Sequence, residues 1–420
     1  MNFSRQLTEV CNKLSRLKAG AVFTNAGDEK IKLAVDLIAS KLSEIDFVIW
    51  IAPSAFFSTP SYKSQIKFYA GEIIKKICFF SIESVSLSDD KYLKLYNICD
   101  KYRTFCVMDD SLSIKNTEAS RTRRLIAIHK KFKYRLVLSA VPLTQGLVDL
   151  YSQLTFIDSN ILQMTETQFA NYFLPFYWDS FFKIKRRWST PENEKNLIKM
   201  MRPYILRFDL NDWNGNLRHY NQDFELTPAE AENYRKEKED FLKDKYNVAF
   251  MEVAQKFQQI YTIAKNKVEA LFQLVRQIEK RNEKVIIYTK YLDEVVFLRE
   301  SGGFVKGAFV ELTGRSNKLK AIRRFEEDIN IMFCTYRVDR LNLSLHACDN
   351  IIYFSQTFDY KDKVQSLYNL NQSLRPRQVN IYNFWVKTGL EKLIRDNLDR
   401  KKFVLNNVCR QMSREAVLSL

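Results

Sequence analysis

Short apolar runs alternate with amphipathic segments along about the first 160 residues of the chain. Five runs have the pattern of buried strands that end in polar or turn residues: AGAVFTN, DFVIWIAP, KKICFFSIES, RTFCVMDD and YRLVLSAVP. Three segments between them carry apolar residues at helical spacing: EKIKLAVDLIASKL, SYKSQIKFYAGEII and SRTRRLIAIHKKF. This alternation predicts a parallel sheet covered by helices on both faces, with its chemistry at the carboxyl ends of the strands.

The pattern changes between residues 165 and 280 and then returns. An aromatic and basic segment, FANYFLPFYWDSFFKIKRRW, precedes a long helical stretch. We expect that stretch to begin with Thr227 as N-cap, Pro228 at the first helical position and Glu230 completing the start signal. Strand-like runs then resume with EKVIIYTKY, FVELTG, INIMFCTY, NIIYFSQT and VNIYNFWV. The prediction is an α/β protein with two lobes, residues 1–164 and 280–420, joined by a helical insert at residues 165–279.

Charge narrows the class of partner. Lys and Arg together number 66 against 49 Asp and Glu, which gives a net charge of +17. Such an excess favours a polyanion, with nucleic acid first and an anionic membrane surface second. The chain has only ten glycines in 420 residues, well below the usual share of about 7%. A glycine-rich phosphate-binding loop is therefore not expected.

Cysteine usage and hydropathy indicate where the protein works. The seven cysteines form no C-x-x-C pair, which is typical of a reducing compartment and predicts no zinc site. The amino-terminal segment MNFSRQLTEV lacks the apolar core of a signal peptide, and no uncharged apolar stretch reaches 18 residues. We expect an intracellular protein, cytoplasmic or in a nucleoid or nucleus, that is neither secreted nor in a membrane. Frequent Lys, Asn, Phe and Ile are typical of an AT-rich genome such as that of a phage or other mobile element.

The order of several segments resembles the Swi/Snf-like helicase ATPases of superfamily two. The first lobe carries the segments VIWIAPSAFFSTPSYKSQIKFY, VMDDSLSIKN, LVLSAVPLTQGLVDLYSQLTFID and MMRPYILRF. The second carries KVIIYTKY, DRLNLSLHACDNIIYFSQTFDY and VQSLYNLNQSLRPRQVNIYNF. The resemblance rests on this shared order over some 350 residues, because no single segment is specific. It implies two RecA-like lobes, with ATP bound between them and duplex DNA running across both. It also implies that Ser54, in the first segment, contacts the DNA backbone.

The phosphate-loop position departs from the family. Such a loop needs glycines, so that backbone N–H groups can surround the phosphates, together with a lysine and a hydroxyl for Mg²⁺. Gly27 and Lys30 fall on matching positions, and Gln6 matches the family's adenine-contacting glutamine. However, Glu29 replaces a glycine and Ile31 replaces the hydroxyl. A carboxylate repels a triphosphate, and an alkyl group cannot ligate a metal. Two interpretations stay open here: an ordinary strand–turn–helix, or a weak nucleotide site formed by Gln6, Gly27 and Lys30.

The acidic box is also altered. Asp109 and Asp110 end a predicted strand, where the family has a metal-binding acid followed by a Glu that positions the attacking water. Asp110 is one methylene shorter than Glu, and a displacement of about 1 Å can cost on the order of 10²-fold in rate. Leu112 occupies the position of the family's histidine. The pair is either an acidic turn or a residual Mg²⁺ site with Asp109 as the ligand.

The family's two finger arginines fall on Asn369 and Gln372. An amide cannot supply the positive charge that stabilises a phosphoryl transition state, a contribution on the order of 10³–10⁵ in rate. Arg375 and Arg377 lie nearby and would substitute only if the register shifted. Residues 139–141, Ser-Ala-Val, likewise replace the Thr-Gly-Thr of the coupling motif. Each catalytic position is altered while the scaffold pattern persists, which predicts a pseudo-ATPase.

Basic residues gather in three clusters that could bind phosphates if each cluster lies on one face. The clusters are Arg121, Arg123 and Arg124, then Lys183, Lys185, Arg186 and Arg187, and finally Lys318, Lys320, Arg323 and Arg324. A solvated surface is the alternative for each cluster taken singly. The aromatic residues at 167–188 could stack on unpaired bases, although each taken singly is more typical of a core.

The leading hypothesis is a DNA-binding, helicase-like protein that has lost efficient ATP hydrolysis and needs no cofactor. It would serve as a scaffold or regulator in DNA replication, repair, recombination or transcription. Its partners would be DNA, taken to be duplex and bound without sequence preference, and proteins of the same assembly, but no membrane. Two alternatives stay open: an active DNA translocase that uses ATP and Mg²⁺ through non-standard residues, and a protein-interaction module whose charge only aids solubility.

Overall fold

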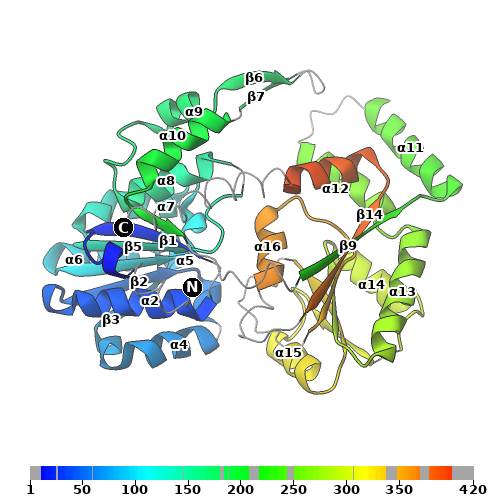
Figure 1. Cartoon of the computed structure of the whole chain (residues 1–420), viewed down its shortest axis with the longest axis horizontal. Coiled ribbons are helices and arrows are strands. Elements are labelled where there is room, and N and C mark those ends of the chain that lie inside the picture. Colours follow the sequence, from blue (N-terminus) through cyan, green and yellow to red (C-terminus); the bar gives the residue numbers. More distant parts are fainter. Residues whose placement is uncertain are drawn as a thin grey trace. The chain divides into compact units, whose positions relative to one another are not determined.

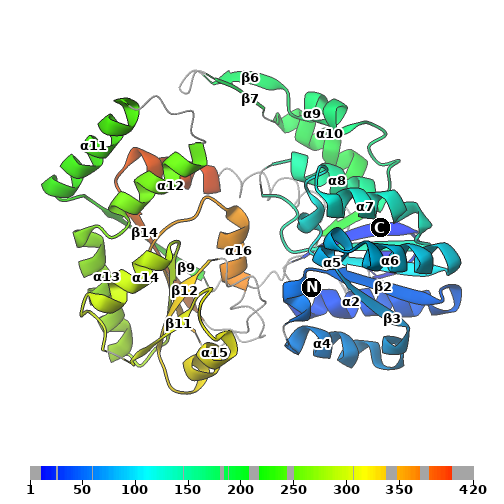
Figure 2. The same ribbon diagram turned by 180° about the vertical axis from the view of Figure 1, so that it is seen from behind.

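The structure is a computed structural model in which residues 11–24, 27–58, 60–144, 146–179, 184–187, 189–207, 217–243, 250–305, 307–336, 348–368 and 378–399 are described. The chain divides into two compact units whose boundary lies between Leu210 and Asn211. Within the described residues, each unit is built on one six-stranded sheet (Figures 1 and 2).

The strands of the first sheet are all parallel, in the order β3-β2-β4-β5-β1-β8. They are β1 (Ala19–Phe23), β2 (Phe47–Ala52), β3 (Ile77–Ser81), β4 (Thr104–Asp109), β5 (Tyr134–Ser139) and β8 (Ile205–Arg207). Every residue of β1 and β4 is buried, as expected for strands that are covered on both faces.

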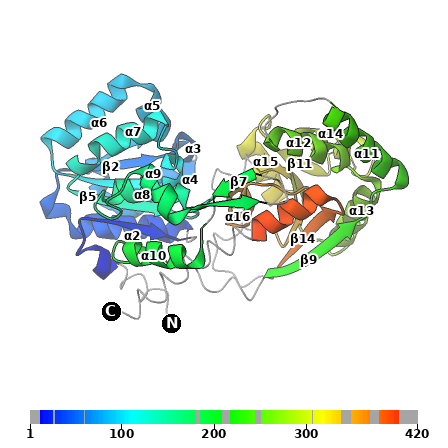
Figure 3. The same ribbon diagram turned by 90° about the horizontal axis from the view of Figure 1, so that it is seen from above.

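Helices cover both faces of this sheet; for example, α6 and α7 lie on one side and α2 on the other (Figure 3). The α-helices of the first unit are α2 (Gly27–Ser40), α3 (Ser54–Phe57), α4 (Pro60–Ala70), α5 (Ile82–Leu87), α6 (Asp89–Lys101), α7 (Ser120–Ile128), α8 (Val148–Ile157), α9 (Glu166–Phe173) and α10 (Pro191–Met201). Short 3₁₀ turns are η1 (Leu42–Glu44), η2 (Gly71–Lys76), η3 (Ser111–Ile114) and η4 (His129–Lys131). A two-stranded antiparallel hairpin, β6 (Phe176–Asp179) with β7 (Ile184–Arg187), lies between α9 and α10.

The second sheet is also parallel, in the order β11-β12-β10-β13-β14-β9. Its strands are β9 (Leu217–Phe224), β10 (Val285–Thr289), β11 (Phe309–Leu312), β12 (Ile331–Thr335), β13 (Asn350–Tyr353) and β14 (Val379–Val386). The helices of this unit are α11 (Pro228–Lys243), α12 (Phe250–Tyr261), α13 (Lys265–Lys280), α14 (Leu292–Glu300), α15 (Lys318–Glu327), α16 (Tyr360–Tyr368) and a helix at residues 389–399.

The structure confirms the predicted fold class and the ten predicted strands. It also adds strands that the apolar pattern did not indicate. β8 and β9 each complete one sheet, and β9 does so with mostly exposed residues, because it pairs through its backbone with β14. The predicted helix start is confirmed, since the Thr227 N–H donates to Glu230 Oε2 at 2.8 Å and α11 begins at Pro228.

The region between the two predicted lobes contains more than helices. Residues 166–207 hold α9, the β6–β7 hairpin, α10 and β8, and they belong to the first unit. Residues 217–280 hold β9 and the separate helices α11, α12 and α13, and they belong to the second. The three-part division at residues 164 and 279 stays a prediction. Within the described residues, no helix is both long enough and apolar enough to span a bilayer.

Candidate functional site

The carboxyl ends of β1 and β4 bring together the two charged residues that the motif positions singled out. Lys30 lies in the first turn of α2, which follows β1, and Asp109 is the last residue of β4. Lys30 Nζ lies 2.8 Å from Asp109 Oδ1. The Lys30 side chain is 8% exposed and that of Asp109 is 0% exposed. The ion pair is therefore buried, where each charge depends on the other for compensation.

Other protein groups also donate hydrogen bonds to the two oxygens of the Asp109 carboxylate. The Tyr62 hydroxyl donates to Asp109 Oδ2 at 2.6 Å, and the Asp110 backbone N–H donates to Oδ1 at 2.9 Å. Trp50 Nε1 in turn donates to the Tyr62 hydroxyl at 3.0 Å. Burial, followed by the charge of Asp109, raises the pKa of Tyr62 well above its usual value, so this hydroxyl keeps its proton and remains a donor. Asp109 thus has a donor on each oxygen before any ligand arrives.

Sequence reasoning did not find Tyr62 or Trp50. Tyr62 lies on α4 and is separated from Asp109 by 47 positions in the sequence. The local pattern of SYKSQIKFY indicated only a helix with an apolar side, and Tyr62 was not singled out. Only the packing of α4 against the sheet brings the phenol to the carboxylate.

The position that would carry a metal-binding hydroxyl is part of the core. Ile31 is 1% exposed and packs in the cluster formed by α2, α4 and the sheet. Gln6, Asn25 and Ala26, and the side chain of Glu29, lie outside the described part of the structure. The first turn of α2 thus offers a buried lysine and a buried alkyl group.

The acidic turn is held by its own backbone and side chains. Asp110 has a φ of 58°, a left-handed conformation that Asp tolerates better than most residues. Its Oδ2 accepts a hydrogen bond from Ser113 Oγ at 3.0 Å, and its carbonyl accepts from the Ser113 N–H at 2.9 Å. Leu112, at the family's histidine position, is buried with 6% exposure. These contacts give Asp110 a structural role, because they close the turn that follows β4.

A second polar network links the segment after this turn to α8. Lys115 Nζ donates to Thr144 Oγ1 at 2.8 Å and lies 3.5 Å from Asp149 Oδ1. The Thr144 N–H donates to Asp149 Oδ2 at 2.6 Å. This link was not predicted from the sequence, in which Lys115 appeared only within the segment VMDDSLSIKN. Ser139, in the altered coupling motif, is fully buried, and its hydroxyl has no hydrogen-bond partner among the described residues.

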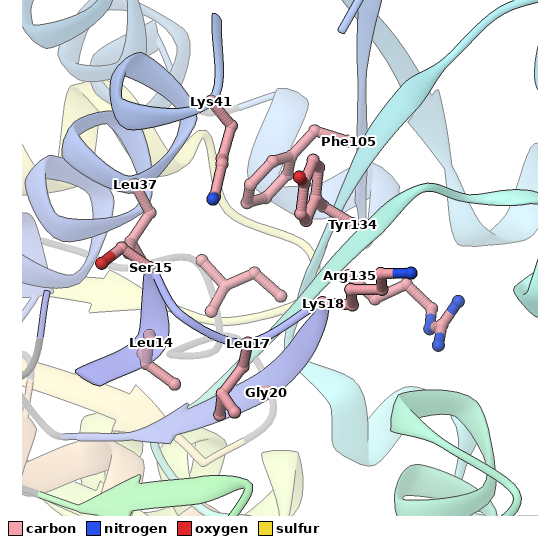
Figure 4. A pocket seen from close by; sticks show the side chains of 11 residues that line it. Leu14, Ser15, Leu17, Lys18, Gly20, Leu37, Lys41, Phe105, Tyr134 and Arg135 are labelled. Carbon is pink, nitrogen blue, oxygen red and sulfur yellow. The ribbon is translucent and has the colours of Figure 1, made fainter. Parts of the chain in front are cut away.

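A small pocket in the first unit lies at the opposite end of the sheet (Figure 4). It is lined by Gly20 of β1, Phe105 of β4 and Tyr134 of β5, close to the amino ends of those strands, together with Leu14 and Leu17. Its volume is about 20 Å³, room for about one water molecule. A nucleotide needs several hundred Å³, so this pocket is not a nucleotide site.

The arginines of α7 differ from one another in their surroundings. Arg121 Nε donates to the Ser113 carbonyl at 2.7 Å. Arg124 donates to the Val85 carbonyl at 3.0 Å and forms an ion pair with Asp89. Arg123 is exposed, although it also donates to the backbone of residue 118. Two of the three predicted DNA contacts therefore brace the fold, and Arg123 is the one that faces solvent.

The second predicted cluster lies on the β6–β7 hairpin. The register sets three aromatic residues of β6 opposite three basic residues of β7: Phe176↔Arg187, Tyr177↔Arg186 and Trp178↔Lys185. The Arg187 guanidinium lies 4.0 Å from the centroid of the Phe176 ring, which is 59% exposed. Lys183 lies outside the described residues. Of the aromatics at 167–188, Phe169 and Phe173 are fully buried, as a core interpretation expects, whereas Phe176 is open to solvent.

The third cluster lies on α15. Lys320, Arg323 and Arg324 are exposed and Lys318 is partly buried. Arg323 pairs with Glu327 one turn away. The first turn of the helix contains no acidic residue, although a helix N-terminus favours negative charge and disfavours cations. Arg315, which is exposed just before the helix, extends this basic end and was not singled out from the sequence.

Ser54 begins α3, and its backbone N–H donates to Glu83 Oε2 at 2.8 Å. The predicted positions Asn369 and Gln372, and the nearby Arg375 and Arg377, lie outside the described residues.

Buried polar side chains also gather in the second unit, beside the carboxyl ends of β10 and β13. Glu294 accepts from Ser355 Oγ at 2.8 Å, and Lys267 Nζ donates to the Thr262 carbonyl at 2.7 Å. Burial lowers the pKa of Lys267 to about 8, although Glu294 and Glu391 oppose this shift. A charge there is costly because water cannot reach it. Among the described residues of the whole chain, no cluster of three or more His, Cys, Asp or Glu side chains has the form of a metal site.

Comparison with known proteins gives a family and two solved structures. The model of the family described as "SNF2-related domain" matches residues 56–286. The chain is 15% identical to the SWI2/SNF2 ATPase core of Sulfolobus solfataricus solved in complex with dsDNA, over 96% of this chain and 91% of that one, with a TM-score of 0.42. It is 15% identical to the same organism's SWI2/SNF2 ATPase core domain, over 97% and 90%, with a TM-score of 0.43. No curated protein matches. Since the family model covers more than half of the chain and includes the strand that ends in Asp109, this protein belongs to the SNF2-related domain family.

Proposed function

We propose that this protein binds DNA through a helicase-like scaffold and has lost efficient ATP hydrolysis. It serves as a scaffold or regulator in an assembly for DNA replication, repair, recombination or transcription. The observation that carries the proposal is the Asp109 carboxylate, which is 0% exposed and hydrogen bonded on both oxygens by Lys30, Tyr62 and the Asp110 backbone.

The residues present do not fit a Mg·ATP complex. A metal ion at Asp109 would compete with the buried Lys30 ammonium and the buried Tyr62 hydroxyl for the carboxylate oxygens, and Lys30 would then need a new partner for its buried charge. The usual hydroxyl ligand is absent, because Ile31 lies in the core. A phosphate would also need Lys30, which is already paired. Nucleotide binding would therefore have to offset the loss of contacts that the fold itself uses.

DNA binding is supported by charge and by the exposed basic residues. The net charge of +17 favours association with a negatively charged partner such as DNA. Arg123, Lys320 and Arg324 are exposed on two different helices. The basic first turn of α15 is destabilising without an anion and favourable beside a phosphate. Contacts of this kind recognise the backbone and carry no sequence information.

Calorimetric titration tests the nucleotide half of the proposal. We expect no binding of Mg·ATP with a Kd below about 10 μM, which corresponds to ~7 kcal/mol. Phosphate release should stay at background with and without duplex DNA. Asp109→Asn is the matched control, because it should leave this background unchanged. DNA-stimulated turnover near 1 s⁻¹, roughly the low end of typical enzymes, that disappears in Asp109→Asn would instead establish the active translocase.

Fluorescence anisotropy with two unrelated duplexes tests the DNA half. We expect the two affinities to agree within about threefold and the logarithm of the binding constant to fall linearly with the logarithm of salt concentration. An affinity that does not respond to salt, or the absence of binding at low salt, would favour the protein-interaction module.

A further inference from the structure

The outer strand of the first sheet has an open edge. β3 pairs with β2 from Val48↔Ile77 to Ala52↔Ser81, and no other strand in the described residues pairs with it. An edge strand presents alternate N–H and C=O groups that lack sheet partners. β3 lies at the end of the sheet beyond β2 (Figures 1 and 2). Alternate residues of β3 therefore present backbone N–H and C=O groups on this side.

A groove of about 360 Å³ runs beside this edge. Its lining consists of residues 78–81 of β3, Ser84 of α5, and Lys91 and Lys94 of α6. Cys78 and Phe79 are half-buried. The groove thus combines strand backbone, short hydroxyl side chains and apolar surface, and two lysines lie along one wall.

Lysines lie on both sides of the edge. Lys91 and Lys94 are exposed, and their side chains form no ion pair within the described part of the chain. On the opposite face of β3, the Lys63 Nζ lies 5.4 Å from the centroid of the Phe57 ring and 5.8 Å from that of Phe79. The first turn of α6 also holds two acidic residues, Asp89, which pairs with Arg124, and Asp90, but neither lines the groove. The open edge is therefore flanked by positive charge.

We propose that the open edge of β3 binds an extended, acidic peptide segment of a partner protein, which adds to the sheet as a further strand. The peptide backbone supplies hydrogen bonds to the edge, and its alternate side chains lie over the two faces. Its acidic side chains, all on one face, meet Lys91 and Lys94 on the α6 side, and its apolar side chains lie on the other face, where Phe57 and Phe79 pack. None of the residues that line this groove is among the proposed nucleotide and DNA contacts.

The chemistry of the edge favours a peptide over the other polyanions and over a second copy of the chain. A strand edge exposes as many carbonyl acceptors as N–H donors, and a phosphate backbone has no donors to meet those carbonyls. A second copy paired edge to edge would bring the same lysines face to face, which is repulsive. An acidic extended peptide satisfies both the backbone groups and the charges.

The test uses the full chain and a fluorescein-labelled heptapeptide in which valine and glutamate alternate. One control peptide carries lysine in place of glutamate. The other keeps the glutamates and is N-methylated at alternate residues, which blocks the backbone hydrogen bonds along one edge. We expect each control to bind at least tenfold more weakly than the parent peptide. Hydrogen–deuterium exchange should show slower exchange of the amides at residues 77–81 when the parent peptide is bound.

Charge reversal on the protein provides the second arm. Lys91→Glu with Lys94→Glu should weaken peptide binding at least tenfold, whereas Lys91→Arg with Lys94→Arg should retain it. Lys101→Glu with Lys130→Glu makes the same change in net charge elsewhere on the first unit, and it should alter binding by less than threefold.

Four results would each overturn the proposal. The first is equal binding of the N-methylated peptide, and the second is unchanged exchange at residues 77–81, because either shows attraction without strand addition. The third is an equal loss of binding in the Lys101 and Lys130 control. The fourth is displacement of the peptide by duplex DNA or by self-association of the chain, which would assign the edge to a different occupant.

Discussion

Asp109 and Lys30 depend on each other because both are buried. Replacing Lys30 by Ala leaves the Asp109 carboxylate with only its neutral donors, and we expect the free energy of unfolding to fall by about 3–5 kcal/mol. The measurement is urea unfolding followed by circular dichroism. The matched control is Lys32→Ala on the same helix, which removes an exposed pair with Asp36 and should cost less than about 1 kcal/mol.

Restoring charge balance provides a check on that result. Lys30→Ala combined with Asp109→Asn should be more stable than Lys30→Ala alone, because no uncompensated carboxylate remains. If Lys30→Ala and Lys32→Ala are equally stable, the Lys30–Asp109 pair does not contribute to the fold in solution.

Lys267 gives the second unit a pH dependence whose sign can be worked out. Its pKa is about 8 in the folded chain and 10.5 ordinarily. Below pH 8 the lysine is charged in both states, and its burial penalty is present in full. Between pH 8 and 10.5 the unfolded chain binds more protons, so the free energy of unfolding rises with pH. The relief over this window is about 3 kcal/mol.

Lys267→Met tests this sign because methionine fills similar space without a charge. Unfolding at several pH values between 7 and 10.5 should show that the stability of the variant relative to the parent decreases as pH rises. The difference between the two proteins removes the contributions of other titrating groups. A difference that is constant over this range would mean that Lys267 does not titrate there.

Neighbouring arginines of α7 should have separable roles. Arg124→Ala removes the hydrogen bond to the Val85 carbonyl and the pair with Asp89, which tie α7 to α5 and α6. We expect a loss of about 1–2 kcal/mol in stability. Arg123→Ala should change stability by less than about 0.5 kcal/mol and weaken DNA binding instead. Unfolding and anisotropy on the same two variants measure both effects, and the opposite assignment of losses would contradict the structure.

The exposed basic residues of α15 should contribute to the salt dependence of DNA binding. Lys320→Glu with Arg324→Glu removes two phosphate contacts, so the slope of log K against log salt should become shallower by about 1.8. The control is Lys236→Glu with Lys280→Glu, which makes the same change in net charge on α11 and α13. Anisotropy over a salt series measures both slopes. Equal slopes in the two variants would mean that α15 is an ordinary solvated surface.

Across the whole molecule, the loss of catalysis should be shared between the two lobes. Parts that act on one transition state are not additive. Asn369→Arg with Gln372→Arg should therefore leave the protein inactive, and Glu29→Gly with Ile31→Thr should at most add weak nucleotide binding. Only the four changes together, with Asp110→Glu, should bring measurable DNA-stimulated phosphate release.

The restored loop has a structural cost of its own. Ile31 is 1% exposed, and a threonine there buries a hydroxyl in the core, which costs about 1–3 kcal/mol. Stability should therefore be measured beside phosphate release for every variant. Activity from either lobe's changes alone would contradict a shared loss.

Much of the fold was predictable because it depends on local pattern. A strand covered on both faces must be apolar throughout, so runs such as VIWIA indicate it without knowledge of its neighbours. The start of α11 was predictable for the same reason, since Thr227 and Glu230 cap each other within four residues. β9 was missed because its residues are mostly exposed and its pairing with β14 depends on backbone groups that every sequence shares.

The candidate site divides in the same way. The residue types alone already indicated that Ile31 cannot supply a hydroxyl to a metal ion. They also indicated that Asp110 is one methylene shorter than the family's Glu. That Asp109 is closed by Tyr62 and Lys30 could not be read from the chain, because the three residues lie on separate elements. The same holds for Arg121 and Arg124, whose charges looked like those of Arg123 until packing assigned them to internal carbonyls. Periodicity and side-chain chemistry are local properties and can be read in order along the chain, whereas the partner of a buried charge is set by which distant elements the core brings into contact.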